Sequence, residues 1–262
     1  MLHIIQEWML YIMEYCSLPL LENVETHESW DGFLAAQHTQ LIEIWSKIGA
    51  GAPFTPKAGE ALRFMGNDIS KVKAVIIGQD PYPQPGAATG RSFEVMGLTS
   101  SEEKFRQVSL KNIVRLIHEL DRRAKGARPG YPAPFSKVRE DIKEGAFRIA
   151  GPGELFRRWE GQGVLLLNKY LTCEIDKPGS HREIWRDFTS RAIEYLSVGN
   201  ASIVWMLWGG DARGSKAYIK GGSIIESRHP MMCSPGYEDD FLKSDCFSRT
   251  AHIIDWAGGW AG

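Results

Sequence analysis

VKAVIIGQDPY, residues 72–82, begins as an apolar run of strand length and ends in polar residues. Three further short runs have similar aliphatic or β-branched content: GVLLLN at 163–168, IVWMLWG at 203–209 and SIIES at 223–227. Short apolar runs of this kind are typical of strands that are buried on both faces. We therefore expect four strands at the centre of the fold.

Helical patterns lie between these runs. Ser109 is a candidate N-cap for a helix whose apolar face is Leu110, Ile113, Val114, Ile117 and Leu120. Residues 183–196 repeat the same spacing. Strands that alternate with helices favour parallel pairing, with helices covering both faces of the sheet. The sequence thus predicts an α/β fold, a three-layer α/β/α sandwich with a central, mostly parallel four-stranded sheet.

The composition is that of an ordinary globular protein, with 43% hydrophobic and 24% charged residues among 262, which excludes a disordered or fibrous chain. No repeat or linker divides the chain, so we expect one domain over residues 1–262. The net charge of −1 by itself disfavours a strongly basic nucleic-acid binder. However, residues 1–46 hold seven acidic side chains and no Lys or Arg. We expect this segment to be an acidic, helical arm on a moderately basic body.

The cysteines are widely spaced, at Cys16, Cys173, Cys233 and Cys246. Without a Cys-x-x-Cys pair they disfavour a zinc site or an iron–sulfur cluster, so we expect no metal and no cofactor. Scattered cysteines in a chain of this size fit a reducing, cytoplasmic location. Glu7 and Glu14 interrupt the first apolar run, and no basic segment precedes it. We therefore expect neither a signal peptide nor a membrane span.

The residues that follow the expected strands are polar or rich in Gly and Pro: Gln79-Asp80-Pro81-Tyr82, Asn168, Gly209-Gly210-Asp211 and Arg228-His229-Pro230. Ligands of parallel sheets bind beyond the carboxyl ends of the strands. Taken singly, Asp80 could shape a turn and His229 could be a buried structural histidine. Their occurrence together at strand ends favours a functional site.

In this order, the motifs resemble those of family-1 uracil-DNA glycosylases, whose first strand ends in Gly-Gln-Asp-Pro-Tyr-His. The resemblance extends from about Phe64 to Thr250 and rests on these segments in turn: Gly78-Gln79-Asp80-Pro81-Tyr82, Gly90-Arg91-Ser92-Phe93, Ser109-Leu110-Lys111-Asn112-Ile113, Leu165-Leu166-Leu167-Asn168, Ser180-His181, Leu207-Trp208-Gly209, His229-Pro230 and Phe247-Ser248-Arg249. It implies a monofunctional hydrolase of base-excision repair, which flips uracil out of DNA and leaves free uracil and an abasic site.

The resemblance implies that Asp80 and His229 are catalytic. Breaking the glycosidic bond places positive charge on the sugar and negative charge on the departing base. An anionic Asp80 would stabilise the sugar cation and orient or deprotonate the attacking water. A neutral His229 would donate a hydrogen bond to uracil O2.

The resemblance also implies four substrate-binding residues. The Asn168 carboxamide would pair with uracil N3 and O4, which cytosine presents with reversed donor and acceptor. Phe93 would stack on the flipped base. Tyr82 would occupy the space beside C5 and so exclude the methyl group of thymine. Gln79 would contribute its backbone amide.

The expected DNA contacts are where this chain departs from the family. Ser109, Gly209 and Gly210 occupy positions that contact the DNA backbone, although the family has Gly-Ser where this chain has Gly-Gly. Pro83 replaces the family histidine, and a segment without proline, Phe105-Arg106-Gln107-Val108, replaces a proline-rich loop.

The loop after His229 is about two residues longer than the family loop, whose leucine wedges into the base stack. Met231 or Met232 is the candidate wedge, because apolar side chains enter base steps, and Ser234 would contact DNA beside it. We expect the partner to be uracil-containing DNA, single- or double-stranded, bound by a monomer.

Two alternatives stay open at this point. The chain could release another modified base, against which Tyr82 and Asn168 argue, or it could be a catalytically weak uracil-DNA-binding protein, against which Asp80 and His229 argue. A zinc-dependent base deaminase is disfavoured, because the chain lacks a His-x-Glu motif paired with Pro-Cys-x-x-Cys.

Overall fold

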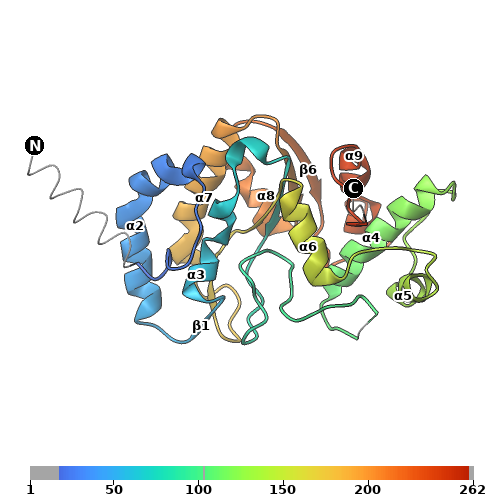
Figure 1. Ribbon diagram of the computed structural model, residues 1–262, viewed down its shortest axis with the longest axis horizontal. Coiled ribbons are helices and arrows are strands. Elements are labelled where there is room, and N and C mark those ends of the chain that lie inside the picture. The colour runs from blue at the N-terminus through green and yellow to red at the C-terminus, as the bar shows by residue number, and fades with distance from the viewer. Residues whose placement is uncertain (1–17, 103, 260–262) are drawn as a thin grey trace, which may run out of the picture.

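The computed structural model describes residues 18–102 and 104–259 of the chain (Figure 1). Its α-helices and strands are, in chain order, α2 (Asp31–Gly49), β1 (Phe54–Thr55), α3 (Ala58–Ala61), β2 (Ala74–Gly78), α4 (Val108–Ala124), α5 (Phe135–Lys143), α6 (Pro152–Gly161), β3 (Val164–Asn168), β4 (Cys173–Glu174), α7 (Arg182–Gly199), β5 (Val204–Trp208), α8 (Gly210–Arg213), β6 (Ser223–Ser227) and α9 (Cys246–Thr250). Short 3-10 helices join several of them.

The central sheet has the order β3-β2-β5-β6, and all three strand pairs are parallel. This confirms the predicted four-stranded sheet, whose strands differ from the apolar runs by at most two residues at either end. The register places Gly78 opposite Asn168 and Trp208 opposite Ser227. The carboxyl ends of all four strands therefore lie at one edge of the sheet. Strands β1 and β4 form a separate antiparallel pair.

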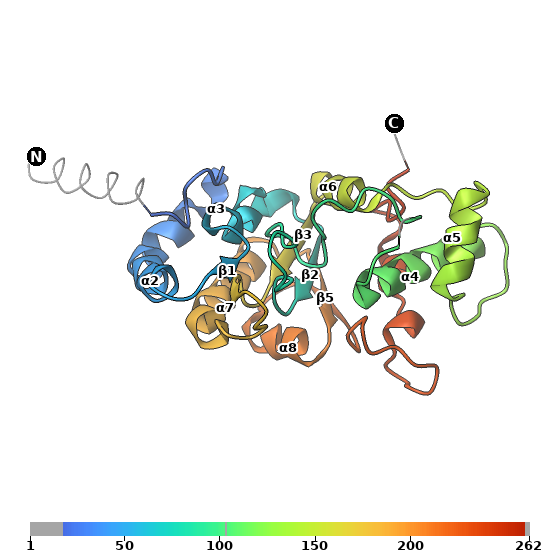
Figure 2. The ribbon, with the colours of Figure 1, turned by 90° about the horizontal axis from the view of Figure 1, so that it is seen from below.

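Side chains of successive strand residues point into two different cores. Val75 and Ile77 belong to the core that α2 and α7 cover, whereas Ala74 and Ile76 belong to the core under α4, α6 and α9. In Figures 1 and 2, α2 and α7 lie on one side of the molecule and α4, α5 and α9 on the other. The three layers of the predicted sandwich are thus confirmed, and the alternation has the two-residue period of a strand.

The predicted cap of α4 is wrong. The residue with extended backbone before this helix is Gln107, and Ser109 already lies within the first helical turn. No side chain caps this helix end. The apolar face of the helix is as predicted, with Leu110, Ile113 and Val114 fully buried.

The predicted N-terminal arm is only partly described by the structure. Residues 1–17 lie outside the described part. Within the described part, a 3-10 helix, Glu28–Trp30, leads into α2, so helix covers the end of the predicted arm. Trp30 and Phe33 are buried in the core against α7 and are not part of a separate appendage. Across residues 18–102 and 104–259, no helix combines the length and the apolar character needed to cross a membrane.

Candidate active site

The parallel register brings the predicted site residues to one edge of the sheet. Asp80 follows β2, Asn168 ends β3, Gly209 follows β5, and His229 lies two residues beyond β6. A backbone hydrogen bond joins the ends of β2 and β3, because the N–H of Lys169 donates to the carbonyl of Gly78 at 2.9 Å. Four segments that are distant in sequence therefore frame one rim, as predicted.

The side chains of Asn168, Ser92 and Phe93 meet over the last residue of β2, Gly78, and we call this place the niche. A Cβ atom on Gly78 would lie 2.6 Å from Oδ1 of Asn168, 2.9 Å from Cβ of Ser92 and 3.5 Å from the ring of Phe93. The Asn168 side chain is buried, with 3% of its surface exposed. Only glycine fits at this point, where a backbone and a carboxamide approach closely. The carboxamide and the aromatic ring are thus neighbours, as the expected base pocket requires.

Phe93 is held in an uncommon backbone conformation. Its φ angle is +64°, in the left-handed region that residues with a Cβ rarely adopt. Its ring centroid lies 5.5 Å from that of Trp208 and 5.9 Å from that of His229. Backbone strain of this kind gathers at functional sites, where surrounding contacts enforce it. The Phe93 ring thus lies beside the imidazole of His229, tilted by 37° to it.

Asp80 carries a carboxylate with a perturbed pKa. Oδ2 accepts a hydrogen bond of 2.8 Å from the Gln79 side chain, whereas the buried Oδ1 has no hydrogen-bond partner among the described residues. Burial raises the pKa of Asp80 to about 6, which the Gln79 hydrogen bond and the positive charge of Arg182 partly oppose. Asp80 is thus ionised at neutral pH but held at an energetic cost, which is typical of catalytic groups. The sequence suggested only a backbone role for Gln79.

The geometry assigns a tautomer to His229. The backbone N–H of Met231 donates to Nδ1 at 3.1 Å, so Nδ1 acts as acceptor and a neutral ring carries its hydrogen on Nε2. Burial lowers the pKa of His229, opposed by the negative charge of Asp211, which favours the neutral ring. Gly209, with φ +94°, lies so close that a Cβ there would be 2.9 Å from Cβ of His229. His229 is therefore fixed as a neutral donor through Nε2.

Tyr82 lies at the same rim and packs against the core on the α4 face. Its hydroxyl is buried without a hydrogen-bond partner among the described residues, and burial raises the pKa of Tyr82. The hydroxyl of Tyr82, Oδ1 of Asp80 and Nε1 of Trp208 are all unpartnered buried polar atoms. Buried polar groups are nearly always hydrogen-bonded in native proteins, so each of these atoms is a candidate contact for a ligand.

A charged cluster beside the rim was not foreseen from the sequence. Arg182 lies 3.3 Å from the carboxylate of Asp211 and packs over the ring of Tyr170. The Tyr170 hydroxyl donates to the same carboxylate at 3.2 Å, and Lys169 donates to the Asp211 carbonyl at 2.8 Å. The charges of Arg182 and Asp211 act in opposite senses on the pKa of Asp80. This cluster therefore tunes the field at the catalytic carboxylate.

The loop that follows His229 is anchored at both ends. Asn112 of α4 donates to the carbonyl of Pro230 at 2.6 Å, and the N–H of Ser234 donates to Asp240 at 3.3 Å. Asp240 also accepts a 2.7 Å hydrogen bond from the hydroxyl of Tyr131. The loop is therefore held against α4 and against the segment that follows it.

Between these anchors the two methionines face outward. Met231 is 58% exposed and Met232 is 52% exposed, which leaves both available to a partner. Ser109 is buried in α4 one turn before Asn112, and Gly210 is exposed at the start of α8. Of the predicted DNA-contacting residues, Gly210 and the two methionines are thus exposed, whereas Ser109 is buried.

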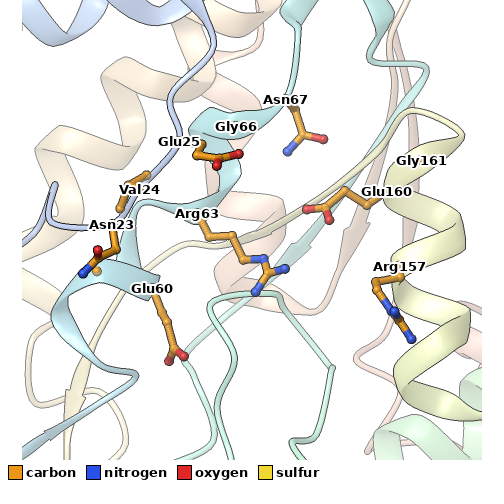
Figure 3. Close-up of a pocket in the computed structure, with 11 residues that line it drawn as sticks. Asn23, Val24, Glu25, Glu60, Arg63, Gly66, Asn67, Arg157, Glu160 and Gly161 are labelled. Atoms are coloured by element: carbon orange, nitrogen blue, oxygen red, sulfur yellow. The ribbon is translucent and has the colours of Figure 1, made fainter.

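Two of the cavities that the described residues form lie away from this rim. Figure 3 shows one of about 580 Å³, into which Arg63, Asn67 and Glu160 project. A second cavity, of about 690 Å³, is lined mainly by apolar residues around Phe54 and Met96. Among residues 18–102 and 104–259, no three His, Cys, Asp or Glu side chains are grouped so that they could hold a metal ion.

The comparisons with known proteins agree with this geometry. A uracil-DNA glycosylase of Mycolicibacterium gilvum is 31% identical over 245 residues, which is 92% of this chain and 94% of that protein. The chain belongs to the uracil-DNA glycosylase family. A second family member, uracil-DNA glycosylase 1 of Streptomyces avermitilis, is 33% identical over 210 residues, covering 80% of each chain.

Solved structures in the uracil-DNA glycosylase family share the fold. The crystal structure of mimivirus uracil-DNA glycosylase aligns with a TM-score of 0.61 and 23% identity over 84% of this chain and 75% of that one. At this identity the likeness supports the α/β fold rather than any residue role. No family model matches the chain.

The close approach at Gly78 can be tested by adding one methyl group. In Gly78→Ala the new Cβ would displace the Asn168 carboxamide, so we expect uracil excision to fall by about a hundredfold. Overpacking costs only about 1–3 kcal/mol of stability, so the protein should still fold. Gly161→Ala, where a Cβ meets no atom within 4 Å, is the matched control. Full activity of Gly78→Ala in a glycosylase assay would contradict the assignment of Gly78 to the niche.

The raised pKa of Asp80 predicts a pH-dependent gain in stability when its charge is removed. Its pKa of about 6 in the folded state exceeds the ordinary 3.8, so the folded protein binds an additional proton between these pH values. The unfolding free energy of the wild type therefore falls as the pH rises through this window. We expect Asp80→Asn to be more stable at pH 7.5 by about 1–2 kcal/mol, since the carboxylate keeps some solvent.

Urea unfolding at pH 4.5, 6.0 and 7.5 would measure this difference. The advantage of Asp80→Asn should shrink toward pH 4.5, and the exposed Asp187→Asn should show none. Lower stability of Asp80→Asn at pH 7.5 would show that burial does not penalise the Asp80 charge.

Proposed function

We propose that this protein is a monofunctional uracil-DNA glycosylase that flips uracil out of DNA and hydrolyses its N-glycosidic bond. The observation that supports this best is the niche over Gly78, where Asn168 and Phe93 meet beside His229. Family membership and the α/β fold agree with it.

In the proposed reaction Asp80 works on the sugar side. As the C1′–N bond breaks, positive charge develops on the deoxyribose, and the Asp80 carboxylate stabilises it. The unpartnered Oδ1 can orient the attacking water and take its proton, while Gln79 holds Oδ2. Since burial raises the pKa of Asp80 to about 6, the carboxylate is ionised at neutral pH and basic enough for this step.

His229 works on the base side. The Met231 N–H occupies Nδ1, so a neutral ring presents Nε2–H to uracil O2, where negative charge gathers as the base leaves. A fixed neutral donor stabilises this charge without reorganising during the reaction. Opposite charge development on sugar and base is thus met by two different groups.

Selectivity for uracil is assigned to the niche. The Asn168 carboxamide reads N3 and O4, Phe93 stacks on the ring, and Tyr82 blocks the position of a thymine methyl group. The burial of Asn168 supports this proposal, because a dry carboxamide discriminates strongly against a base with reversed donors and acceptors.

We assign DNA contacts to the residues around the rim. These are Ser109 in the first turn of α4, Gly209 and Gly210 after β5, and Ser234 in the anchored loop. Exposed Met231 and Met232 are the proposed wedge that fills the space of the flipped base. The proposed substrate is uracil-containing DNA, single- or double-stranded.

We further propose that the whole chain acts as one domain and as a monomer in the cytoplasm. The described cysteines Cys173, Cys233 and Cys246 are free, which supports a reducing environment. The packing of α2 into the core beside α7 supports a single folding unit.

The proposed function predicts a defined cleavage pattern. Oligonucleotides with U·G, U·A, single-stranded U or T·G are incubated with the protein, and abasic sites are then cleaved with alkali. We expect cleavage at uracil and none at thymine, with Asp80→Asn slower by about 10³-fold or more because charge stabilisation is lost. Binding of uracil DNA without cleavage would favour a binding protein, and cleavage only of another modified base would change the substrate.

A further inference from the structure

The chain on either side of Phe93 contributes to a cluster of buried charges that the proposed mechanism does not use. The Arg91 side chain is 5% exposed, and its Nη1 lies 2.9 Å and 3.2 Å from the two carboxylate oxygens of Glu94, which is itself 7% exposed. Nη2 of Arg91 pairs with Glu160 at the end of α6. Thr89 donates its hydroxyl hydrogen to Glu94 at 2.5 Å, and the backbone N–H of Arg91 donates to Oγ1 of Thr89 at 3.2 Å.

This cluster closes a tight turn around Phe93. Arg91 and Glu94 flank Phe93 in the chain, so their ion pair ties together the two ends of the segment that bears the ring. Gly90, with φ +86°, lies directly before Arg91, and a Cβ on Gly90 would come 2.1 Å from the carbonyl oxygen of Glu60. Glu160 joins the turn to α6, an element of the rigid core. The backbone around Phe93 is therefore fixed on three sides.

Stability alone does not account for buried charges at this place. Removing ions from water costs several kcal/mol each, and a well-packed apolar replacement is often as stable or more so. In some proteins, buried charged or polar groups instead serve to specify one geometry. The strained residue between them is Phe93, whose left-handed backbone must be enforced by its surroundings.

We infer that Arg91, with Glu94 and Glu160, is a positioning residue that holds the Phe93 ring in its stacking place over the niche. The inference rests on the proposed function, in which Phe93 stacks on the flipped base. Arg91 contacts neither base nor sugar and acts only through the turn. Glu160 is the outer member of the cluster, since it also projects into the open cavity of Figure 3.

A double-mutant cycle separates positioning from general stability. Arg91→Met alone would leave Glu94 as an unpaired buried charge, so Arg91→Met/Glu94→Gln is the variant to use. We expect this pair to lower kcat/KM on single-stranded uracil DNA by about tenfold, as loss of one stacking contact predicts. In a Phe93→Ala background the same pair should change kcat/KM by less than about twofold.

Two further variants complete the experiment. Glu160→Gln keeps the shape of its side chain and should show an intermediate loss, which again disappears in the Phe93→Ala background. Arg157→Met changes an arginine that lines the cavity of Figure 3 and pairs with Glu154 outside the cluster, and it should leave kcat/KM unchanged. Equal losses in the wild-type and Phe93→Ala backgrounds would overturn the positioning role.

A crystal structure of Arg91→Met/Glu94→Gln provides a readout that does not depend on activity. The inference predicts that Phe93 leaves its left-handed conformation, and an unchanged φ near +64° would overturn it. Failure of the proposed function is distinguishable, because then the wild-type protein itself would not release uracil.

Discussion

The close approach of the Gly78 backbone to the Asn168 carboxamide is the constraint on which the site depends. Parallel pairing of β2 with β3 sets these two residues opposite each other, and the missing Cβ lets the carboxamide lie above the strand. A second close approach, between the Gly209 backbone and the His229 side chain, lies at the ends of β5 and β6. The niche is thus defined by backbone approach at two strand ends, which a rigid parallel sheet holds more accurately than loops could.

Burial sets the protonation states of both catalytic groups. It raises the pKa of Asp80 to about 6, which is still below neutral pH, and it lowers the pKa of His229. A carboxylate and a neutral imidazole therefore coexist at neutral pH. The charge of Arg182 opposes the effect of burial on the pKa of Asp80, whereas the charge of Asp211 adds to it at Asp80 and opposes it at His229. The energetic cost of holding an ionised Asp80 in a dry site is the counterpart of its readiness to react.

Much of the fold could be predicted because four apolar runs are unambiguous in length and each ends in polar residues. The same logic found Asp80, Asn168 and His229, since strand ends of a parallel sheet converge whatever lies between them. Ser109 was misplaced as a cap because the helix begins earlier, at Val108, and helix ends are weakly encoded.

Other features depend on contacts between distant segments, which a single sequence does not reveal. The left-handed Phe93, the pairing of Arg91 with Glu160 and the cluster around Asp211 are of this kind. Gly78 did carry a signal, because a glycine that ends a buried strand often marks close approach of another group. The net charge of the chain did not predict DNA binding, since we expect the DNA to be bound through loops and a base pocket.

A crystal structure of the protein with free uracil tests the central claim most directly. The account predicts uracil in the niche above Gly78, with its ring against Phe93, N3 and O4 facing the Asn168 carboxamide, and O2 within hydrogen-bond distance of Nε2 of His229. Uracil bound elsewhere, or in the niche with its N3 edge turned away from Asn168, would contradict it.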